Sequence, residues 1–165
     1  MTGPLNSLKV LDFSTLLPGP FATMMLADLG AEVLRVEAPN RPDMSRMVPP
    51  FDNKVSSLHS LLARSKKSIF LDLKKSEAIK ILHELVKQFD ILVEQFRPGV
   101  MERLGLGYHQ LKEINPKLIY CSITGYGQSG SFKQKAGHDI NYLSVSGIAS
   151  YSGTKEHGPA PIGPQ

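Results

Sequence analysis

Short apolar runs alternate with helical patterns along most of the chain. Five runs have the length and composition of strands: residues 9–13, 32–37, 68–73, 90–95 and 118–124. Residues 21–29 form a strongly apolar helical pattern, and residues 77–89 form an amphipathic one whose apolar positions recur every three to four residues. Strands that alternate with helices are typical of βαβ units. The pattern therefore predicts an α/β fold with an open, mostly parallel, Rossmann-like sheet and flanking helices.

Proline and glycine residues and polar segments separate these runs. Pro18-Gly19-Pro20 precedes the first helical pattern and Gly30 follows it, which predicts where that helix begins and ends. Residues 40–57 are polar and rich in Pro, Met and Arg, so we expect a loop there. We expect residues 1–151 to form one α/β domain. Residues 152–165 lack apolar periodicity, and we expect an irregular tail.

Composition narrows the class of protein. The 165 residues are 41% hydrophobic and 21% charged, which is ordinary for a globular protein of about one domain. There is no apolar run of the ~20 residues that a membrane span needs and no basic-then-apolar pattern, so we expect neither a membrane span nor a signal peptide. The single cysteine, Cys121, excludes an intramolecular disulfide and favours a cytoplasmic location. Because Cys121 lies in an apolar run, we expect it to be buried.

The formal net charge is +4, and the positive excess lies between Arg35 and Lys75. This excess indicates either a solvated face or a surface for an anionic, phosphorylated ligand. Nucleic acid is disfavoured because aromatic residues do not interleave with the basic ones. Arg97 follows the strand-like run that ends at residue 95, at the sheet edge where α/β proteins bind ligands. Arg97 is therefore a candidate for phosphate, unless it pairs with Glu94 or Glu102.

Residues 125–130 match the spacing G-x-G-x-x-G directly after a strand-like run. In dinucleotide-binding folds this motif follows the first strand and opens a helix. Here it follows the fifth run, and residues 131–135 lead into another Ala-Gly break instead of a helix. We therefore expect a glycine loop whose amides, Gly125 and Gly127 among them, line an active site.

His138 follows this loop and precedes a helix-like run, residues 142–145. Histidine is the side chain whose ordinary pKa lies nearest neutrality, and a helix start favours its neutral, proton-accepting form. His138 is thus a candidate acid/base group, although it could instead satisfy a backbone carbonyl. Asp139 either orients the imidazole or caps the helix. The histidines have no metal-ligand spacing, and we expect no metal.

Taken together, these segments resemble the family III CoA-transferases over nearly the whole chain. The resemblance rests on many short segments that occur in one order: residues 10–13, 18–20, 27–33, 68–74, 96–100, 102–105, 118–120, 125–130 and 137–142. The family includes CoA-transferases and α-methylacyl-CoA racemases. Residues 137–142 are most similar to the racemase branch.

The resemblance implies an acyl-CoA ligand, with coenzyme A held partly by Arg97. Many family members have an arginine directly after the second strand, where this chain has Ala38, and Arg41 is the substitute we expect. Leu17 stands where formate- and oxalate-specific members often have glutamine, which disfavours those substrates. The family forms interlocked homodimers, so the expected partner is a second copy of the chain.

The resemblance also implies two chemistries. In the racemase branch, the histidine matching His138 and a later aspartate exchange the α-proton of a 2-methylacyl-CoA, and amide donors stabilise the enolate. In the transferase branch, that aspartate is the nucleophile that moves CoA between carboxylic acids. The matching aspartate would lie beyond Gln165, and Asp139 does not match it. We expect racemisation. A CoA-transferase and a catalytically inactive CoA-binding or interaction module remain the alternatives.

Overall fold

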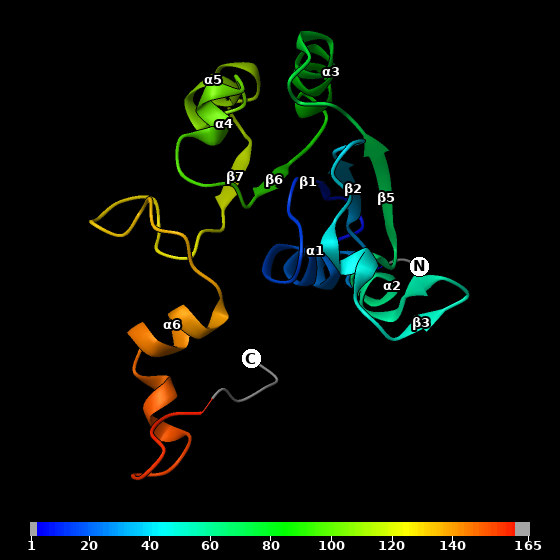
Figure 1. The fold of residues 1–165 in the computed structure, drawn as a ribbon. Coiled ribbons are helices and arrows are strands. Elements are labelled where there is room, and N and C mark those ends of the chain that lie inside the picture. Colours follow the sequence, from blue (N-terminus) through cyan, green and yellow to red (C-terminus); the bar gives the residue numbers. More distant parts are fainter. Residues whose placement is uncertain (1–2, 161–165) are drawn as a thin grey trace. The chain divides into compact units, whose positions relative to one another are not determined.

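The structure is a computed structural model that describes residues 3–160. The chain forms two units, Met1–Ile123 and Thr124–Gln165 (Figure 1). The first unit holds a five-stranded sheet in the order β5-β2-β1-β6-β7, with every pairing parallel. Its strands are β1 (Lys9–Asp12), β2 (Glu32–Glu37), β5 (Lys66–Phe70), β6 (Ile91–Glu94) and β7 (Ile119–Ser122). The prediction of an open parallel α/β sheet is confirmed.

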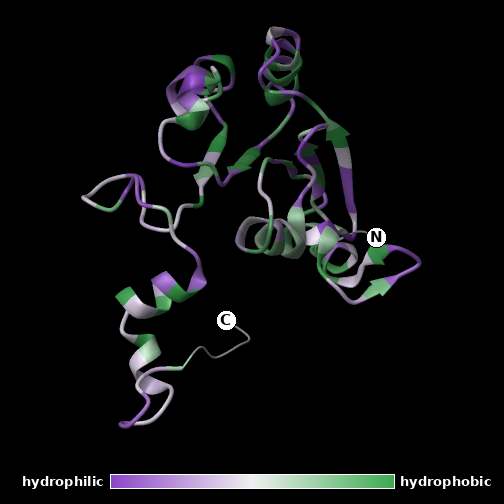
Figure 2. Ribbon diagram, viewed as in Figure 1, coloured by the Kyte–Doolittle hydropathy of each residue, from purple (hydrophilic) through white to green (hydrophobic). Residues whose placement is uncertain are grey.

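Helices lie on both faces of this sheet. They are α1 (Pro18–Asp28), α2 (Ser57–Ala63), α3 (Ser76–Val86), α4 (Val100–Arg103) and α5 (Tyr108–Ile114). Alternate residues of β1 point to opposite faces: Val10 packs in one core with Ala27 of α1, whereas Leu11 packs in the other with Leu82 of α3. In Figure 2 β6 and β7 are mostly green, while the edge strand β5 is purple over much of its length.

Element ends depart from the predicted ones by a few residues. The predicted strand at residues 32–37 is confirmed as β2, and the strand predicted at 68–73 begins earlier, at Lys66. Helix α1 begins at Pro18, before the apolar pattern, because proline needs no N–H partner in the first turn. The loop expected at residues 40–57 is only partly right.

That segment contains three short elements. They are the 3-10 turn η1 (Met44–Met47) and an antiparallel hairpin of β3 (Phe51–Asp52) and β4 (Val55–Ser56). Side chains hold them: Asp43 caps η1 by accepting from the Ser45 N–H, and Ser56 caps α2 by accepting from the His59 N–H. Periodicity does not detect such short, side-chain-capped elements.

The expectation of a buried Cys121 is wrong, because this side chain is exposed. Strand β7 lies at the sheet edge and pairs only with β6, and Ile119, two residues earlier on the same side, is 61% exposed. An apolar run thus marks the strand correctly but does not show that both of its sides are covered.

The second unit holds α6 (Asp139–Val145) and the 3-10 turn η2 (Ile148–Tyr151). Aromatic rings pack within it, with Tyr126 edge-on to both Phe132 and Tyr142 at centroid distances of 5.6 and 5.2 Å. In the predicted tail, Thr154 and Gly158 form an isolated bridge, and residues 161–165 lie outside the described residues. No helix among residues 3–160 is long and apolar enough to cross a membrane.

Candidate functional site

A cavity of about 370 Å³ opens at the carboxyl edge of the sheet in the first unit. Three stretches that follow strands form most of its wall: residues 13–16 after β1, residues 38–44 after β2, and residues 95–97 after β6. Strand β1 lies between β2 and β6, so the chain reverses its direction of winding there. Open α/β sheets bind ligands in the crevice at this switch point. The topology alone therefore selects this cavity as the candidate site.

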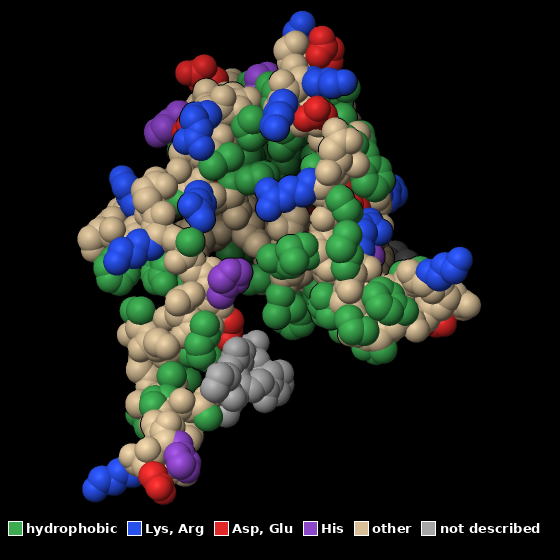
Figure 3. Space-filling model, in the orientation of Figure 1, with side chains coloured by type: hydrophobic (Ala, Val, Ile, Leu, Met, Phe, Trp, Pro, Cys, Tyr) green, Lys and Arg blue, Asp and Glu red, His purple; other side chains and the backbone are tan. Residues whose placement is uncertain are grey.

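The cavity wall combines apolar surface with charge. Apolar side chains come from Phe13, Val36, Leu71, Leu73 and Phe96, and charged ones from Arg35, Glu37, Arg41, Asp43 and Arg97. Figure 3 shows Lys and Arg side chains spread over the first unit, with hydrophobic side chains between them. An apolar wall with exposed arginines suits a ligand that has both an apolar part and anionic groups.

Arg41 and Arg97, predicted separately from the sequence, line this one cavity. Both side chains are exposed, and Arg41 is placed by a backbone bridge to Ala38 just after β2. Among residues 3–160 no ion pair joins Arg97 to Glu94 or Glu102. The structure thus brings together two guanidinium groups that are 56 positions apart in the sequence.

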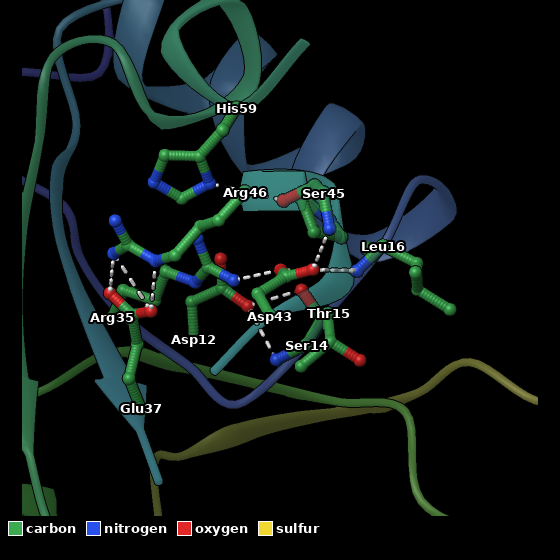
Figure 4. Close-up of polar contacts among 12 residues, drawn as sticks. Asp12, Ser14, Thr15, Leu16, Arg35, Glu37, Asp43, Ser45, Arg46 and His59 are labelled. Carbon is green, nitrogen blue, oxygen red and sulfur yellow. Dashed lines mark hydrogen bonds and ion pairs between the residues drawn. The ribbon is translucent and has the colours of Figure 1, made fainter. Parts of the chain in front are cut away.

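Asp43, which sequence reasoning did not single out, receives several hydrogen bonds beside the cavity (Figure 4). Both of its oxygens accept from the Leu16 N–H at 3.2 Å, Oδ1 accepts from the Ser45 N–H at 2.8 Å, and Oδ2 accepts from Arg35. Burial raises the pKa of Asp43, but hydrogen bonds from Ser45 and Leu16 and the Arg35 charge outweigh it, so the pKa lies below its usual range. Asp43 is therefore a carboxylate at neutral pH.

The turn η1, which Asp43 caps, is also held by a second ion pair and by a histidine. Arg46 donates from its NH2 group to Glu37 Oε1 at 2.8 Å, and Ser45 Oγ lies 3.0 Å from His59 Nδ1 (Figure 4). Burial lowers the pKa of His59, and the positive charges of Arg46 and Arg35 lower it further against the opposite effect of Glu37 and Asp43. His59 is thus held neutral in the fold.

Two prolines and one side-chain contact reduce the number of backbone N–H donors at the start of α1. Pro18 and Pro20 have no N–H group, and the Gly19 N–H donates to Gln95 Oε1 at 3.2 Å. Dinucleotide-binding folds instead use the N–H groups at this place for the pyrophosphate. Arg41 and Arg97 are the exposed cationic side chains that the cavity offers to an anionic ligand.

A buried ion pair fixes α1 to the sheet. Lys66 Nζ lies 3.5 Å from Asp12 Oδ2 and also donates to the Pro20 carbonyl at 2.8 Å and to Thr23 Oγ1 at 2.7 Å. The Asp12 carboxylate also accepts from Ser14 Oγ and Thr23 Oγ1, each at 2.5 Å. Both charged side chains are buried, so this network supports the loop after β1 and is not open to ligand.

His138, Gly125 and Gly127 lie in the second unit. His138 precedes α6, its backbone N–H donates to Asn141 Oδ1 at 2.8 Å, and its side chain is exposed. A Cβ on Gly125 would lie 2.1 Å from the Tyr142 hydroxyl, so the aromatic packing around Tyr142 requires a glycine there. Gly127 takes φ +79°, which favours glycine. Among residues 3–160, no three His, Cys, Asp or Glu side chains are grouped to hold a metal ion.

Comparison with known proteins assigns the chain to one family. The family model described as "CoA-transferase family III" matches residues 5–165. Over 157 residues the chain is 45% identical to succinyl-CoA:glutarate CoA-transferase of Homo sapiens, covering 94% of the chain and 36% of that protein. Over 160 residues it is 46% identical to alpha-methylacyl-CoA racemase of Homo sapiens, covering 96% of the chain and 38% of that protein.

A solved structure has the same fold. A CAIB/BAIF family protein from Brucella suis superposes with a TM-score of 0.91 at 36% sequence identity, covering 99% of this chain and 44% of that one. The chain thus spans less than half the length of each of these three proteins.

Proposed function

The chain belongs to CoA-transferase family III, and from this premise we propose that it supplies the CoA-binding part of an acyl-CoA enzyme. The observation that carries the proposal is the shared position of Arg41 and Arg97 at one cavity. Coenzyme A has anionic phosphates and a flat adenine ring. The two guanidinium groups suit the phosphates, and the apolar wall with Phe13 and Phe96 suits the ring.

For the reaction we propose racemisation of a 2-methylacyl-CoA, with His138 as one of two acid/base groups. A single base would return the proton to the face it came from, so inversion needs a second group opposite the first. In this proposal His138 exchanges the α-proton of the thioester with solvent at near-neutral pH. The amides of the Gly125–Gly127 loop would stabilise the enolate that forms between the two proton transfers.

Transfer of CoA between carboxylic acids is the second candidate. The observation that favours it is the similar identity to a transferase and to a racemase, 45% and 46%. The two reactions differ in their requirements, because a transferase needs a second acid and a carboxylate nucleophile, whereas a racemase needs neither. Both proposals include a homodimeric, cytoplasmic protein. A catalytically inactive CoA-binding module is the remaining alternative.

Calorimetry with CoA tests the binding proposal. We expect the chain to bind CoA, and Arg97→Gln to weaken binding about 10- to 150-fold, since a charged hydrogen bond contributes about 1.5–3 kcal/mol. Arg64→Gln is the matched control, because Arg64 pairs with Asp28 on α1 and does not line the cavity. Unchanged binding by the Arg97 variant, or equal losses in both variants, would contradict the placement of CoA.

The reaction is tested with the full-length gene product. We expect interconversion of the two C2 epimers of 2-methylacyl-CoA with incorporation of deuterium in deuterated water, and loss of this interconversion in His138→Ala. Interconversion that survives in the variant would remove His138 from the mechanism. Exchange of CoA between two acids, followed by mass spectrometry, would instead support the transferase.

A further inference from the structure

The turn η1 and strand β2 have complementary charges. Arg35 and Glu37 lie two residues apart on β2 and therefore on one side of it. Arg35 pairs with Asp43, and Glu37 pairs with Arg46, so the turn supplies the opposite charge at both places (Figure 4). Arg35, Glu37 and Asp43 are all nearly inaccessible to solvent. This double pairing holds residues 43–46 in one position over the end of β2.

Asp43 also contacts the loop that follows the neighbouring strand β1. Leu16, in the loop after β1, has φ +63°, a left-handed conformation that is costly for a leucine. Its N–H donates to both oxygens of the Asp43 carboxylate, and Gln95 Nε2 holds the preceding Thr15 carbonyl at 2.9 Å. The strained conformation of Leu16 is therefore kept by side chains that are distant in sequence.

Arg35 depends on the same carboxylate. Its guanidinium is buried, and among the described residues its Nε atom has no hydrogen-bond partner. A buried cation that loses its partner is strongly disfavoured, because the ion pair no longer offsets the cost of removing the charge from water. Arg35, Leu16 and Asp43 all line the cavity. The shape and the charge of the cavity wall thus both depend on one side chain.

We propose that Asp43 is a positioning residue for ligand binding in this cavity. It holds the Leu16 backbone in its strained conformation and neutralises Arg35, so that the loop after β1 and the segment after β2 form one continuous wall. The proposal rests on the proposed function only in taking CoA as the ligand. The effect on the wall itself does not depend on which ligand binds.

The first test needs no ligand. In ¹H–¹⁵N spectra of the labelled chain, we expect Asp43→Asn to shift the Leu16 and Ser45 amide signals, because asparagine has one acceptor oxygen where the carboxylate has two, and the Leu16, Ser45 and Arg35 donors use both. Asp28→Asn is the matched control, since it removes the same charge from another Asp–Arg pair, on α1 and outside the cavity. A Leu16 signal that moves equally in both variants, or in neither, would overturn the proposal.

The second test uses CoA as the probe. Calorimetry should show about tenfold weaker binding to Asp43→Asn, about 1.4 kcal/mol, and unchanged binding to Asp28→Asn. Unchanged affinity in Asp43→Asn would overturn the role in ligand binding. If the wild-type chain does not bind CoA, the proposed function fails, while the Leu16 signal still decides whether Asp43 positions the wall.

A measurement on the wild-type chain decides the case in which Asp43→Asn does not fold. Hydrogen exchange should show the Leu16 amide protected from solvent, since the Asp43 carboxylate is its acceptor. An unprotected Leu16 amide in the folded wild-type chain would overturn the proposal without any variant.

Discussion

The Gln95 side chain joins Gly19 to the end of β6. Its Oε1 accepts from the Gly19 N–H at 3.2 Å, and its Nε2 donates to the Thr15 carbonyl at 2.9 Å. One amide side chain thus connects the start of α1 and the loop after β1 to the neighbouring strand, directly at the switch point of the sheet. This contact also occupies the N–H group that a dinucleotide-binding fold would offer to a phosphate.

Gly19→Ala should destabilise the first unit. A Cβ at this position would lie 2.2 Å from the Ser14 Cβ and 2.8 Å from Gln95 Oε1, so the start of α1 must shift. Overpacking of this kind costs about 1–3 kcal/mol, measured by urea unfolding. Ala22→Ser adds one heavy atom to the exposed side of the same helix and should change stability little. Equal stabilities of the two variants would contradict this close packing.

Much of the first unit could be predicted because parallel strands and their helices repeat a regular pattern. Residues 32–37 form β2 as predicted, since a short run with two valines and a leucine, with Gly30 before it and Pro39 after it, is typical of a strand. Arg97 could be predicted as part of a site because strand ends in a parallel sheet meet at one edge. Arg41 is expected from the family resemblance alone, and the structure places it at the same cavity.

The supporting side chains could not be predicted in the same way. Asp43 lies in a polar segment without periodicity, and only its contacts with Leu16 and Arg35 reveal its role. Arg35 lies within a strand, where a charged residue usually marks a solvated side, yet it is buried through its pairing with Asp43. Such pairs depend on the tertiary structure, and no local spacing specifies them.

Lys66→Met should be much more destabilising than Arg64→Met. Removal of Lys66 leaves the buried Asp12 carboxylate without its cation, and breaking a buried pair in this way costs about 3–5 kcal/mol. The Arg64–Asp28 pair is exposed to solvent, and its loss should have little effect. Urea unfolding of both variants measures the difference. Similar losses would show that the Asp12–Lys66 pair is not buried in solution.

Glu94→Gln should stabilise the fold increasingly as the pH rises above 4.5, the ordinary glutamate pKa. Burial raises the pKa of Glu94, and the Glu102 charge raises it further, against hydrogen bonds from Ser122 and the Phe96 N–H. The folded state therefore binds the proton more tightly than the unfolded state, and ionisation reduces stability. The free energies of unfolding of the wild-type chain and of Glu94→Gln, measured from pH 4.5 upwards, test whether the stability difference grows with pH. A stability difference that does not change with pH would contradict it.

His59 should make the fold less stable as the pH falls below 6.5, the ordinary histidine pKa. Burial and the charges of Arg46 and Arg35 lower the pKa of His59 in the folded state, so in this range the unfolded state binds more protons. By linkage, the free energy of unfolding then decreases as the pH decreases. His59→Gln should reduce this dependence, measured as the unfolding midpoint at a series of pH values.

His59→Gln removes both the titrating imidazole and its contact with Ser45. Ser45→Ala removes only the contact, so it shows which of the two causes the pH dependence of stability. The variant removes the hydroxyl that lies 3.0 Å from His59 Nδ1 but leaves the imidazole among Arg46, Arg35, Glu37 and Asp43. We expect Ser45→Ala to lower stability at every pH and to keep the wild-type dependence on pH, which His59→Gln reduces. If both variants lost the dependence equally, the hydrogen bond would account for it instead of the protonation of the buried histidine.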